Sequence, residues 1–216
     1  MSATLPQASL AFPQSLAEKY RPRRISDFIG LDKPRKILAK LAAQPFASAW
    51  LFVGPSGTGK TSIALALAAE IHAELIHIPS QHCTVSELEE SLRMTQYVPM
   101  QGKKFWLVLV DEADAMSDKA QLALLSKLDA TGMRDNVIFI FTCNATDRLE
   151  SRFVSRCKTL EFKNYGLNGG LIELLRRVWA IEASGQPEPN FAQLTKGIGN
   201  NVREALQRLE LEIMGA

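Results

Sequence analysis

The sequence predicts an α/β protein in which a parallel sheet of five strands lies between layers of helices, followed by a small helical domain. Short apolar runs alternate with longer segments of helical periodicity through most of the chain, which is the pattern of βαβ units. Several runs, such as Leu107–Val110, are apolar without interruption, as expected for strands buried on both faces of a parallel sheet. After residue 163 the strand-like runs stop and only helical periodicity continues.

The expected elements follow in chain order. A first helix is expected at 33–43, with Asp32 as a candidate N-cap and Pro34 in its first turn. The strands are expected at residues 50–53, 74–78, 106–110, 137–141 and 158–162. Between these strands, helices are expected at 60–71, 84–94 and 117–129, and a helix or turn is expected at 148–155. The C-terminal helices are expected at 171–183, 190–198 and 200–214.

These elements divide the chain into a flexible N-terminal tail at 1–15, an α/β domain at 16–163 and a helical lid domain at 164–216. Asn and Gly residues within 164–170 interrupt the periodicity and predict a hinge. A small domain on such a hinge can close over a ligand bound to the α/β domain.

Composition limits the class of protein. The 216 residues are 46% hydrophobic and 22% charged, so the chain can bury a core. The net charge of +2 does not by itself indicate nucleic-acid binding. No apolar run approaches the ~18 residues of a membrane span, and residues 1–14 lack the basic start of a signal peptide. Few, irregularly spaced cysteines predict a reducing, cytoplasmic location: Cys83, Cys143 and Cys157.

The most specific motif lies at residues 50–61. An apolar strand run is followed by Gly-Pro-Ser-Gly-Thr-Gly-Lys-Thr and then a helix, which matches the phosphate-loop pattern G-x-x-x-x-G-K-S/T in its structural context. Its glycines let successive backbone N–H groups converge on phosphate oxygens: Gly54, Gly57 and Gly59. Lys60 can reach the β and γ phosphates, and the Thr61 hydroxyl can ligate Mg²⁺. The other loop residues expected around the nucleotide are Pro55, Ser56, Thr58 and Ser62.

Acidic residues end a second buried strand. Because ligands sit beyond the carboxyl ends of parallel strands, Asp111 is expected beside the phosphate loop, where it can hold the Mg²⁺ shell. Glu112 can polarise an attacking water as general base; the alternative is that Glu112 and Asp114 are acids that only start a helix. Asn144 follows a third buried run, and alone it fits a γ-phosphate contact and a strand-end turn equally well.

Four further segments resemble those of AAA+ ATPases, in particular the clamp-loader type and the small subunits of replication factor C. Glu18–Arg23 with Asp27–Gly30 resembles the family's "EKYRP…DxxG" segment, and Asp111–Met116 resembles "DEAD-x-M". Ser155–Cys157 resembles the Ser-Arg-Cys motif, and Asn201–Leu206 resembles "GDxRxAL". The resemblance extends from about Leu16 to Leu209.

The resemblance implies roles for further residues. The first segment would line the adenine pocket, through Tyr20, Arg21, Pro22, Ile29 and Gly30. Arg156 would act in trans, as the arginine that reaches the ATP of a neighbouring subunit, with Arg152 as a rival that spacing does not exclude. Arg203 would sense the γ-phosphate when the lid closes. In isolation, each arginine also fits a surface ion pair.

The resemblance also implies partners: neighbouring AAA+ subunits in a homo- or hetero-oligomer, DNA and a sliding clamp. The family carries a third, collar domain, and this chain ends at Ala216, where that domain would start, so assembly is expected to need another subunit or to depend on ATP and DNA. Five basic residues are candidates for phosphate contacts along DNA, or else ordinary solvated side chains: Lys103, Lys104, Lys119, Lys127 and Arg134.

The sequence thus predicts an ATP-hydrolysing, Mg²⁺-dependent AAA+ protein that acts in an oligomer, as a clamp-loader-like ATPase in DNA replication or repair. Two alternatives stay open. The first is a remodeller of protein partners, which a pore contact by Tyr97 would favour, although Tyr97 is better explained as an apolar helix end or loop anchor. The second is an ATP-dependent scaffold with weak hydrolysis. A zinc site is not expected, because four candidate ligands match no standard spacing: His72, His77, His82 and Cys83.

Overall fold

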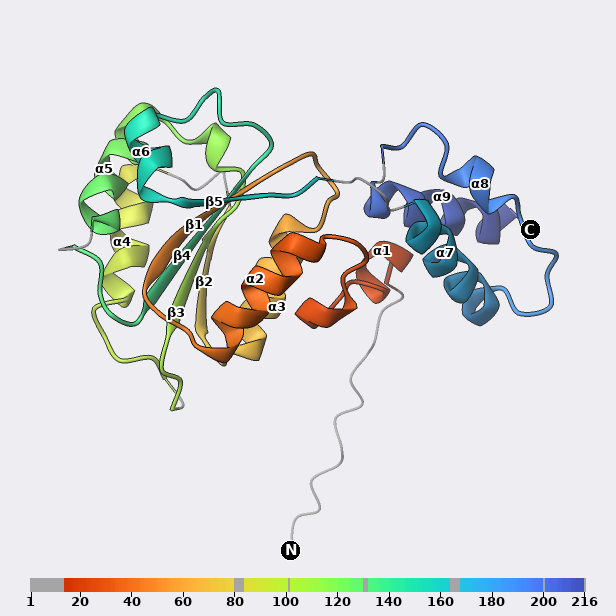
Figure 1. The fold of residues 1–216 in the computed structure, drawn as a ribbon, viewed down its shortest axis with the longest axis horizontal. Coiled ribbons are helices and arrows are strands. Elements are labelled where there is room, and N and C mark those ends of the chain that lie inside the picture. The colour runs from red at the N-terminus through yellow and green to blue at the C-terminus, as the bar shows by residue number, and fades with distance from the viewer. Residues whose placement is uncertain are drawn as a thin grey trace, which may run out of the picture.

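The fold is built on a twisted sheet of five parallel strands (Figure 1). The computed structural model describes residues 14–79, 84–100, 102–129, 132–163, 168–199 and 201–215. The strands are β1 (Ser48–Val53), β2 (Glu74–Ile78), β3 (Trp106–Val110), β4 (Val137–Cys143) and β5 (Lys158–Glu161). They lie in the order β2-β3-β4-β1-β5, and every neighbouring pair is parallel. The three central strands are the apolar runs of the sequence, because both of their faces are covered.

Helices cover both faces of the sheet (Figure 1). One face carries α2 (Asp32–Ala43) and α3 (Lys60–Glu70), and the other carries α4 (Val85–Met94), α5 (Asp118–Leu128) and α6 (Ser151–Arg156). Alternate residues of each strand point to opposite faces. Leu107 and Leu109 of β3 therefore join the core under α2 and α3, while Val108 and Val110 join the core under α4 and α5.

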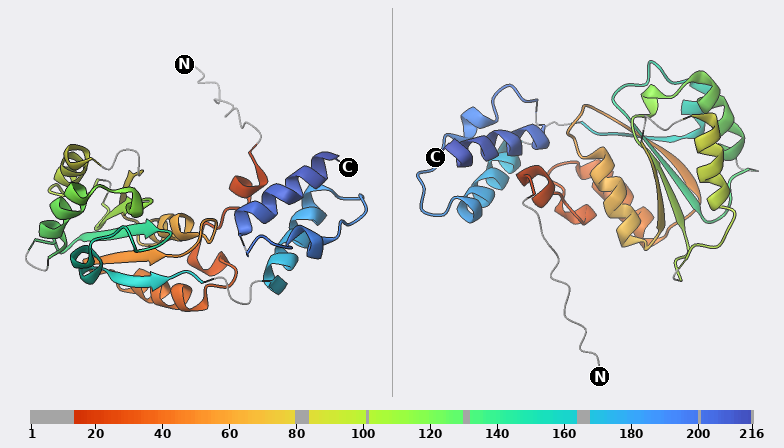
Figure 2. Two further views of the ribbon diagram at one scale, coloured as in Figure 1. Left: turned by 90° about the horizontal axis from the view of Figure 1, so that it is seen from above. Right: turned by 180° about the vertical axis from the view of Figure 1, so that it is seen from behind.

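A third core belongs to the helical domain, which lies beside the sheet at the end of the molecule away from α4 and α5 (Figure 2). Its helices are α7 (Asn168–Glu182), α8 (Phe191–Leu194) and α9 (Val202–Gly215). The short helix α1 (Leu16–Lys19) packs on α9, and Leu16 is buried in the core of the helical domain. The N-terminal segment then returns to the sheet through the 3₁₀ helix η1 (Ile25–Asp27). A second 3₁₀ helix, η3 (Ala113–Ala115), follows β3.

The predicted five-stranded parallel sheet and the helical C-terminal region are confirmed, but three local predictions are wrong. Asp32 is the first residue of α2 rather than its N-cap, a position that Leu31 occupies with a left-handed φ of 55°. The helix predicted at 190–198 ends at Leu194, because Gly197 and Gly199 follow with φ of 78° and 55°.

The third correction concerns the predicted hinge. Asn168, Gly169 and Gly170 form the first turn of α7, and a Cβ on Gly170 would lie 2.6 Å from the side chain of Ile29. Gly170 therefore allows close packing of α7. The rest of the predicted hinge, 164–167, lies outside the described residues, as do residues 1–13 of the predicted tail. Within the described part of the chain, no helix is long and apolar enough to cross a membrane.

Candidate nucleotide site

A cleft of about 1110 Å³ lies between the carboxyl ends of the strands and the helical domain. Its lining comes from the loop after β1, the ends of β3 and β4, the N-terminal segment and α9. This position, beyond the carboxyl edge of a parallel sheet and between two parts of the chain, is where ligands bind in open α/β folds.

The loop between β1 and α3 forms the floor of the cleft. Gly57 and Gly59 have left-handed φ angles of 74° and 88°, which glycine adopts without the steric cost that other residues pay. A Cβ on Gly59 would also lie 3.1 Å from the ring of Phe28. α3 begins at Lys60, directly after Gly59, so its first backbone N–H groups face the cleft and favour an anion there.

Lys60 is held inside this loop. Its side-chain nitrogen donates to the carbonyl oxygens of Gly54 (2.6 Å) and Pro55 (2.9 Å) and to Oδ1 of Asn144 (3.3 Å). Only 8% of Lys60 is exposed, and this burial lowers the pKa of its ammonium. The nearby Cys143, Asp114, Asp111 and Glu112 act in the opposite direction and raise this pKa, but burial has the larger effect. The ammonium and Asn144, predicted from separate motifs, thus meet at one point of the cleft.

Asp111 organises the opposite wall. Its Oδ1 accepts hydrogen bonds from Thr61 and from Thr142, both at 2.8 Å, and its Oδ2 lies 3.0 Å from Nε2 of His77. The pairing of a carboxylate with the Thr61 hydroxyl provides the oxygen ligands that Mg²⁺ prefers, so these two residues fit the predicted metal role.

Glu112 and Asp114 line up beside this pair. Glu112 has a left-handed φ of 51°, and its backbone N–H donates to the hydroxyl of Thr142 at 3.0 Å. Oδ2 of Asp114 accepts the backbone N–H of Asn144 at 3.2 Å. Asp114 therefore positions Asn144, while Glu112 itself lines the cleft.

The N-terminal segment closes one side of the cleft. Tyr20, Arg21, Pro22 and Ile29 line it, and Nε of Arg21 donates to the hydroxyl of Ser62 at 2.9 Å. The remaining predicted nucleotide contacts divide in two groups. Those that line the cleft are Ser56, Gly57, Thr58, Gly59, Lys60, Thr61, Ser62 and Arg203. Those that do not line it are Gly30, Gly54 and Pro55, of which the last two contact Lys60 through their carbonyls.

The helical domain reaches the phosphate loop through α9. Arg203 lies in the first turn of α9 and lines the cleft. The side chain of Asn201 lies so close to Gly57 that a Cβ on Gly57 would be 1.8 Å from its Oδ1. The same Oδ1 accepts the backbone N–H of Glu204 at 3.1 Å, which caps the helix. Arg203 therefore projects from a helix end that already touches the loop.

Arg156 lies elsewhere. It is the last residue of α6, and neither it nor Arg152 is among the described residues that line the cleft. Its Nε donates to Oδ1 of Asp129 at 2.5 Å, and its Nη1 donates to the carbonyl of Arg152 at 3.0 Å. No sequence motif connects Asp129, the residue after α5, with this arginine.

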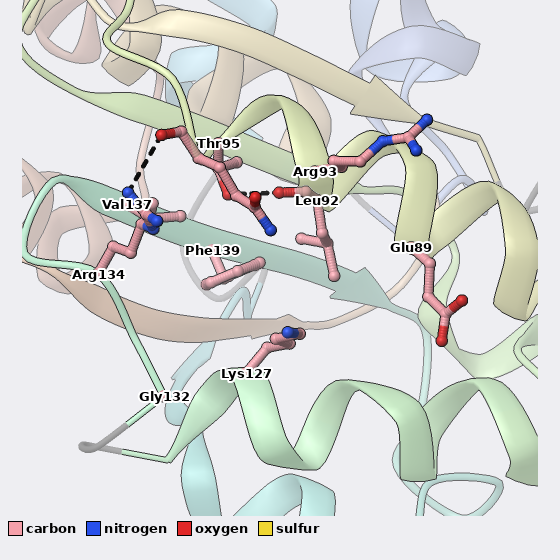
Figure 3. A pocket seen from close by; sticks show the side chains of 10 residues that line it. Glu89, Leu92, Arg93, Thr95, Lys127, Gly132, Arg134, Val137 and Phe139 are labelled. Atoms are coloured by element: carbon pink, nitrogen blue, oxygen red, sulfur yellow. Dashed lines mark hydrogen bonds between the residues drawn. The ribbon is translucent and has the colours of Figure 1, made fainter.

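The five basic residues considered for DNA have different surroundings. Lys119 lies in the first turn of α5, eight residues and about 12 Å along the helix from Lys127. Lys103 is paired with Glu74 at 2.8 Å. Lys127 and Arg134 line a smaller pocket of about 240 Å³ between α4, α5 and β4 (Figure 3).

Tyr97 departs from its expected role as an anchor. It lies three residues after the end of α4 and is 65% exposed, although its backbone carbonyl accepts the indole N–H of Trp106 at 2.9 Å. For the rejected zinc site, no group of three metal-binding side chains exists among the described residues, and His82 and Cys83 lie outside them.

Sequence reasoning missed three residues that contact the predicted site: Thr142, His77 and Asn201. Thr142 lies one residue before the end of β4 and two residues before Asn144, so its position in the motif was a usable signal. His77 becomes a neighbour of Asp111 only because β2 pairs with β3, with Ile78 beside Val110. No local sequence pattern predicts that β2 pairs with β3.

Comparison with known proteins agrees with the geometry. The family described as "ATPase family associated with various cellular activities (AAA)" matches residues 50–165. The chain is 26% identical over 199 residues to the Replication factor C small subunit of Natronomonas pharaonis, which covers 89% of this chain and 60% of that relative. It is 31% identical over 152 residues to the Replication factor C small subunit of Methanocella arvoryzae, which covers 67% of this chain and 47% of that relative. The chain thus spans 60% or less of the length of these two relatives.

A solved structure also shares the fold. A RuvB mutant from Thermotoga maritima aligns with a TM-score of 0.74, covering 92% of this chain and 68% of that one, at 19% identity. That likeness supports the architecture of sheet and helical domain, and the family match covers more than half of the chain, including the phosphate loop and both strands with polar ends. The chain therefore belongs to the AAA family of ATPases, and it is similar in sequence to the Replication factor C small subunits.

Proposed function

We propose that this chain binds ATP with Mg²⁺ in the cleft and hydrolyses it at the boundary between subunits of an oligomer, as a clamp-loader-like ATPase in DNA replication or repair. The observation that carries the proposal is the convergence of Lys60, Thr61, Asp111 and Asn144. Side chains from the phosphate loop and from the ends of two neighbouring strands meet there within 2.6–3.3 Å of their partners.

The residues that line the cleft are suited to bind ATP together with Mg²⁺. The backbone of the glycine loop and Lys60 would bind the phosphates, and Thr61 and Asp111 would hold Mg²⁺, which neutralises phosphate charge when bound. Lys60 already contacts three oxygen atoms. Phosphate oxygens can replace these neutral acceptors, because hydrogen bonds between ionised partners are stronger.

Glu112 is the proposed general base. It lines the cleft directly after Asp111, and the hydrogen bond from its backbone to Thr142 fixes where its side chain starts. Asn144, held by Asp114, would orient the water or the γ-phosphate. In this proposal Asp111 would hold Mg²⁺, and the adjacent Glu112 would accept the proton of the attacking water.

Two arginines would complete the site. Arg203 would contact the γ-phosphate from α9, while Arg156 would supply positive charge in trans to the site of a neighbouring subunit. The trans role is supported by the position of Arg156 outside its own cleft, and by the large rate effect of such arginines, about 10³–10⁵-fold where they have been dissected.

A protein client is supported by an exposed apolar loop at the opposite edge of the sheet. Met94, Tyr97, Val98 and Met100 are between 52% and 83% exposed over seven residues of chain. Contiguous exposed apolar side chains commonly mark protein contacts. A sliding clamp is the client that the family resemblance favours, and neighbouring AAA+ subunits are the expected oligomer partners.

The steady-state ATPase rate with and without primed double-stranded DNA, at two salt concentrations, tests the DNA-linked function. We expect DNA to raise the rate and high salt to abolish the increase, because phosphate contacts are salt-sensitive. A rate that DNA leaves unchanged at both salt concentrations would contradict the DNA-linked role and favour remodelling of a protein partner.

A further inference from the structure

We propose that Asp129 is a positioning residue for Arg156: its carboxylate holds the guanidinium in the orientation that a neighbouring subunit's nucleotide site requires. This inference rests on the proposed trans role of Arg156. It adds to the machinery of hydrolysis a residue that directly follows a different helix, α5, and lies outside all of the motifs.

The contact between the side chains of Arg156 and Asp129 is bidentate. Nε of Arg156 lies 2.5 Å from Oδ1 of Asp129, and Nη2 lies 3.5 Å from Oδ2. A planar guanidinium beside a planar carboxylate in this way is fixed in direction as well as position. The carbonyl of Arg152 adds a third contact, 3.0 Å from Nη1.

These contacts leave donors for an external acceptor. A guanidinium has five N–H groups, and the contacts to Asp129 and Arg152 use one on each of its three nitrogens. Among the described residues, two N–H groups therefore have no acceptor, one on Nη1 and one on Nη2. That pair is suited to a phosphate oxygen, and the side chains are 30% and 44% exposed, so a partner subunit can reach them.

Asp129 is itself anchored. It follows the last residue of α5, and its backbone carbonyl accepts the N–H groups of Gly132 at 2.8 Å and Met133 at 2.9 Å. A Cβ on Gly132 would lie 1.9 Å from the carbonyl of Ser126, so Gly132 packs tightly against α5. The carboxylate thus starts from a fixed backbone.

The helix that carries Arg156 is equally fixed. Phe153 of α6 is fully buried, and its ring packs edge-on against Phe141 of β4 at a centroid distance of 4.8 Å. With both backbones held, the ion pair determines where the guanidinium points. An exposed ion pair contributes little to folding stability, so removing the carboxylate should affect orientation more than folding.

The positioning role of Asp129 can be tested in a nucleotide site formed by two different variant subunits, one of which binds the nucleotide while the other provides Arg156. Lys60→Ala subunits cannot bind nucleotide but still present Arg156, while Arg156→Ala subunits bind nucleotide but present no arginine. The two are mixed with ATP and primed DNA, formation of mixed oligomers is verified, and kcat and KM are measured. Asp129→Ala is then added either to the Lys60→Ala subunit, where Arg156 is present, or to the Arg156→Ala subunit, as the matched control.

We expect the parent mixture to regain activity that neither variant has alone. Asp129→Ala on the Lys60→Ala subunit should lower the regained kcat about tenfold, since a small misplacement of a catalytic charge is costly, with KM within about twofold. The same change on the Arg156→Ala subunit should have no effect. Asp129→Glu on the Lys60→Ala subunit, which keeps a carboxylate, should recover most of the rate.

The other outcomes are distinguishable. No recovery in the parent mixture, or no mixed oligomers, would remove the trans role of Arg156 and this inference with it. Recovery that Asp129→Ala leaves unchanged or increases would overturn the positioning role alone. An equal loss when Asp129→Ala is on either subunit would show a structural effect on folding or assembly and would also overturn it. Thermal unfolding of Asp129→Asn provides a check that the charge is not needed for folding.

Discussion

Asp111 shows how single side chains assemble the site. One oxygen of this carboxylate receives the hydroxyls of Thr61 and Thr142, and the other faces His77. Three elements thus converge on one acid: α3, β4 and β2. Because two donors share Oδ1, the orientation of the carboxylate is set before any ligand binds, which is the preorganisation that electrostatic catalysis requires.

Thr142→Val tests this arrangement. Thr142 is 2% exposed, and valine keeps its shape but removes the hydroxyl that donates to Asp111 and accepts the Glu112 N–H. Loss of a typical hydrogen bond costs about 0.5–1.5 kcal/mol. We expect the free energy of unfolding in urea to fall by about that amount and ATP turnover to fall about tenfold. Thr142→Ser is the matched control and should retain both values; a valine variant with normal turnover would show that the hydroxyl is dispensable.

Elements join through contacts that are distant in sequence. α1 packs on α9 rather than on the sheet, and its end is fastened to α7 by Glu182, which accepts the Tyr20 hydroxyl and pairs with Lys19 at 2.7 Å. Arg21, one residue later, contacts Ser62 of α3. The N-terminal segment is therefore a strap between the helical domain and the phosphate-loop helix.

The strap has a pH signature. Burial, followed by the hydrogen bond to Glu182 and its negative charge, raises the pKa of Tyr20 from 10.0 to about 12. A phenol whose folded pKa lies above its unfolded value adds stability that is fully present below pH 10 and is lost as the pH rises from 10 toward 12. We expect urea unfolding to show that the wild-type protein loses its advantage over Tyr20→Phe across this interval. A stability difference that stays constant from pH 8 to about pH 11.5 would contradict the hydrogen bond.

Sequence predicted the elements well where one local pattern decides the structure. β2 and β3 begin and end at the predicted residues. The apolar run of β3 is uninterrupted, and that of β2 is short with clear ends, so the sequence pattern marks both strands. Lys60, Thr61, Asp111 and Asn144 came from motifs at strand ends, and the parallel sheet brings them together. The packing of α1 on α9 and the pairing of Asp129 with Arg156 depend on tertiary contacts, so no periodicity revealed them. Gly170 was misread because a glycine for close packing and a glycine for a hinge look the same in sequence.

At the scale of the whole molecule, the cleft is shared between the sheet and the helical domain. The phosphates would be bound by the sheet side, while Arg203 and Arg177 line the cleft from the other side. Asn201 already touches Gly57. A ligand that contacts both sides would stabilise their arrangement, which is how a nucleotide can change the shape of a subunit and of an oligomer.

Arg203→Ala should therefore weaken ATP binding by about 10- to 100-fold, because a hydrogen bond to a charged group contributes about 1.5–3 kcal/mol. Arg176→Ala is the matched control: Arg176 is also an exposed arginine of the helical domain, on α7, but is not among the residues that line the cleft. Isothermal titration with a slowly hydrolysed ATP analogue measures both. Equal affinities for the two variants would show that the helical domain does not contact the nucleotide through Arg203.

The most direct test of the proposed hydrolytic site compares ATP binding and turnover in Glu112→Gln. The amide keeps the size of the side chain but cannot accept a proton from water. We predict an affinity for ATP within about twofold of wild type, because Lys60, Thr61 and Asp111 are intact, and a loss of turnover of at least about 100-fold, the lower range for a general base. Normal turnover in this variant would contradict the assignment of the cleft as a hydrolytic site with Glu112 as its base.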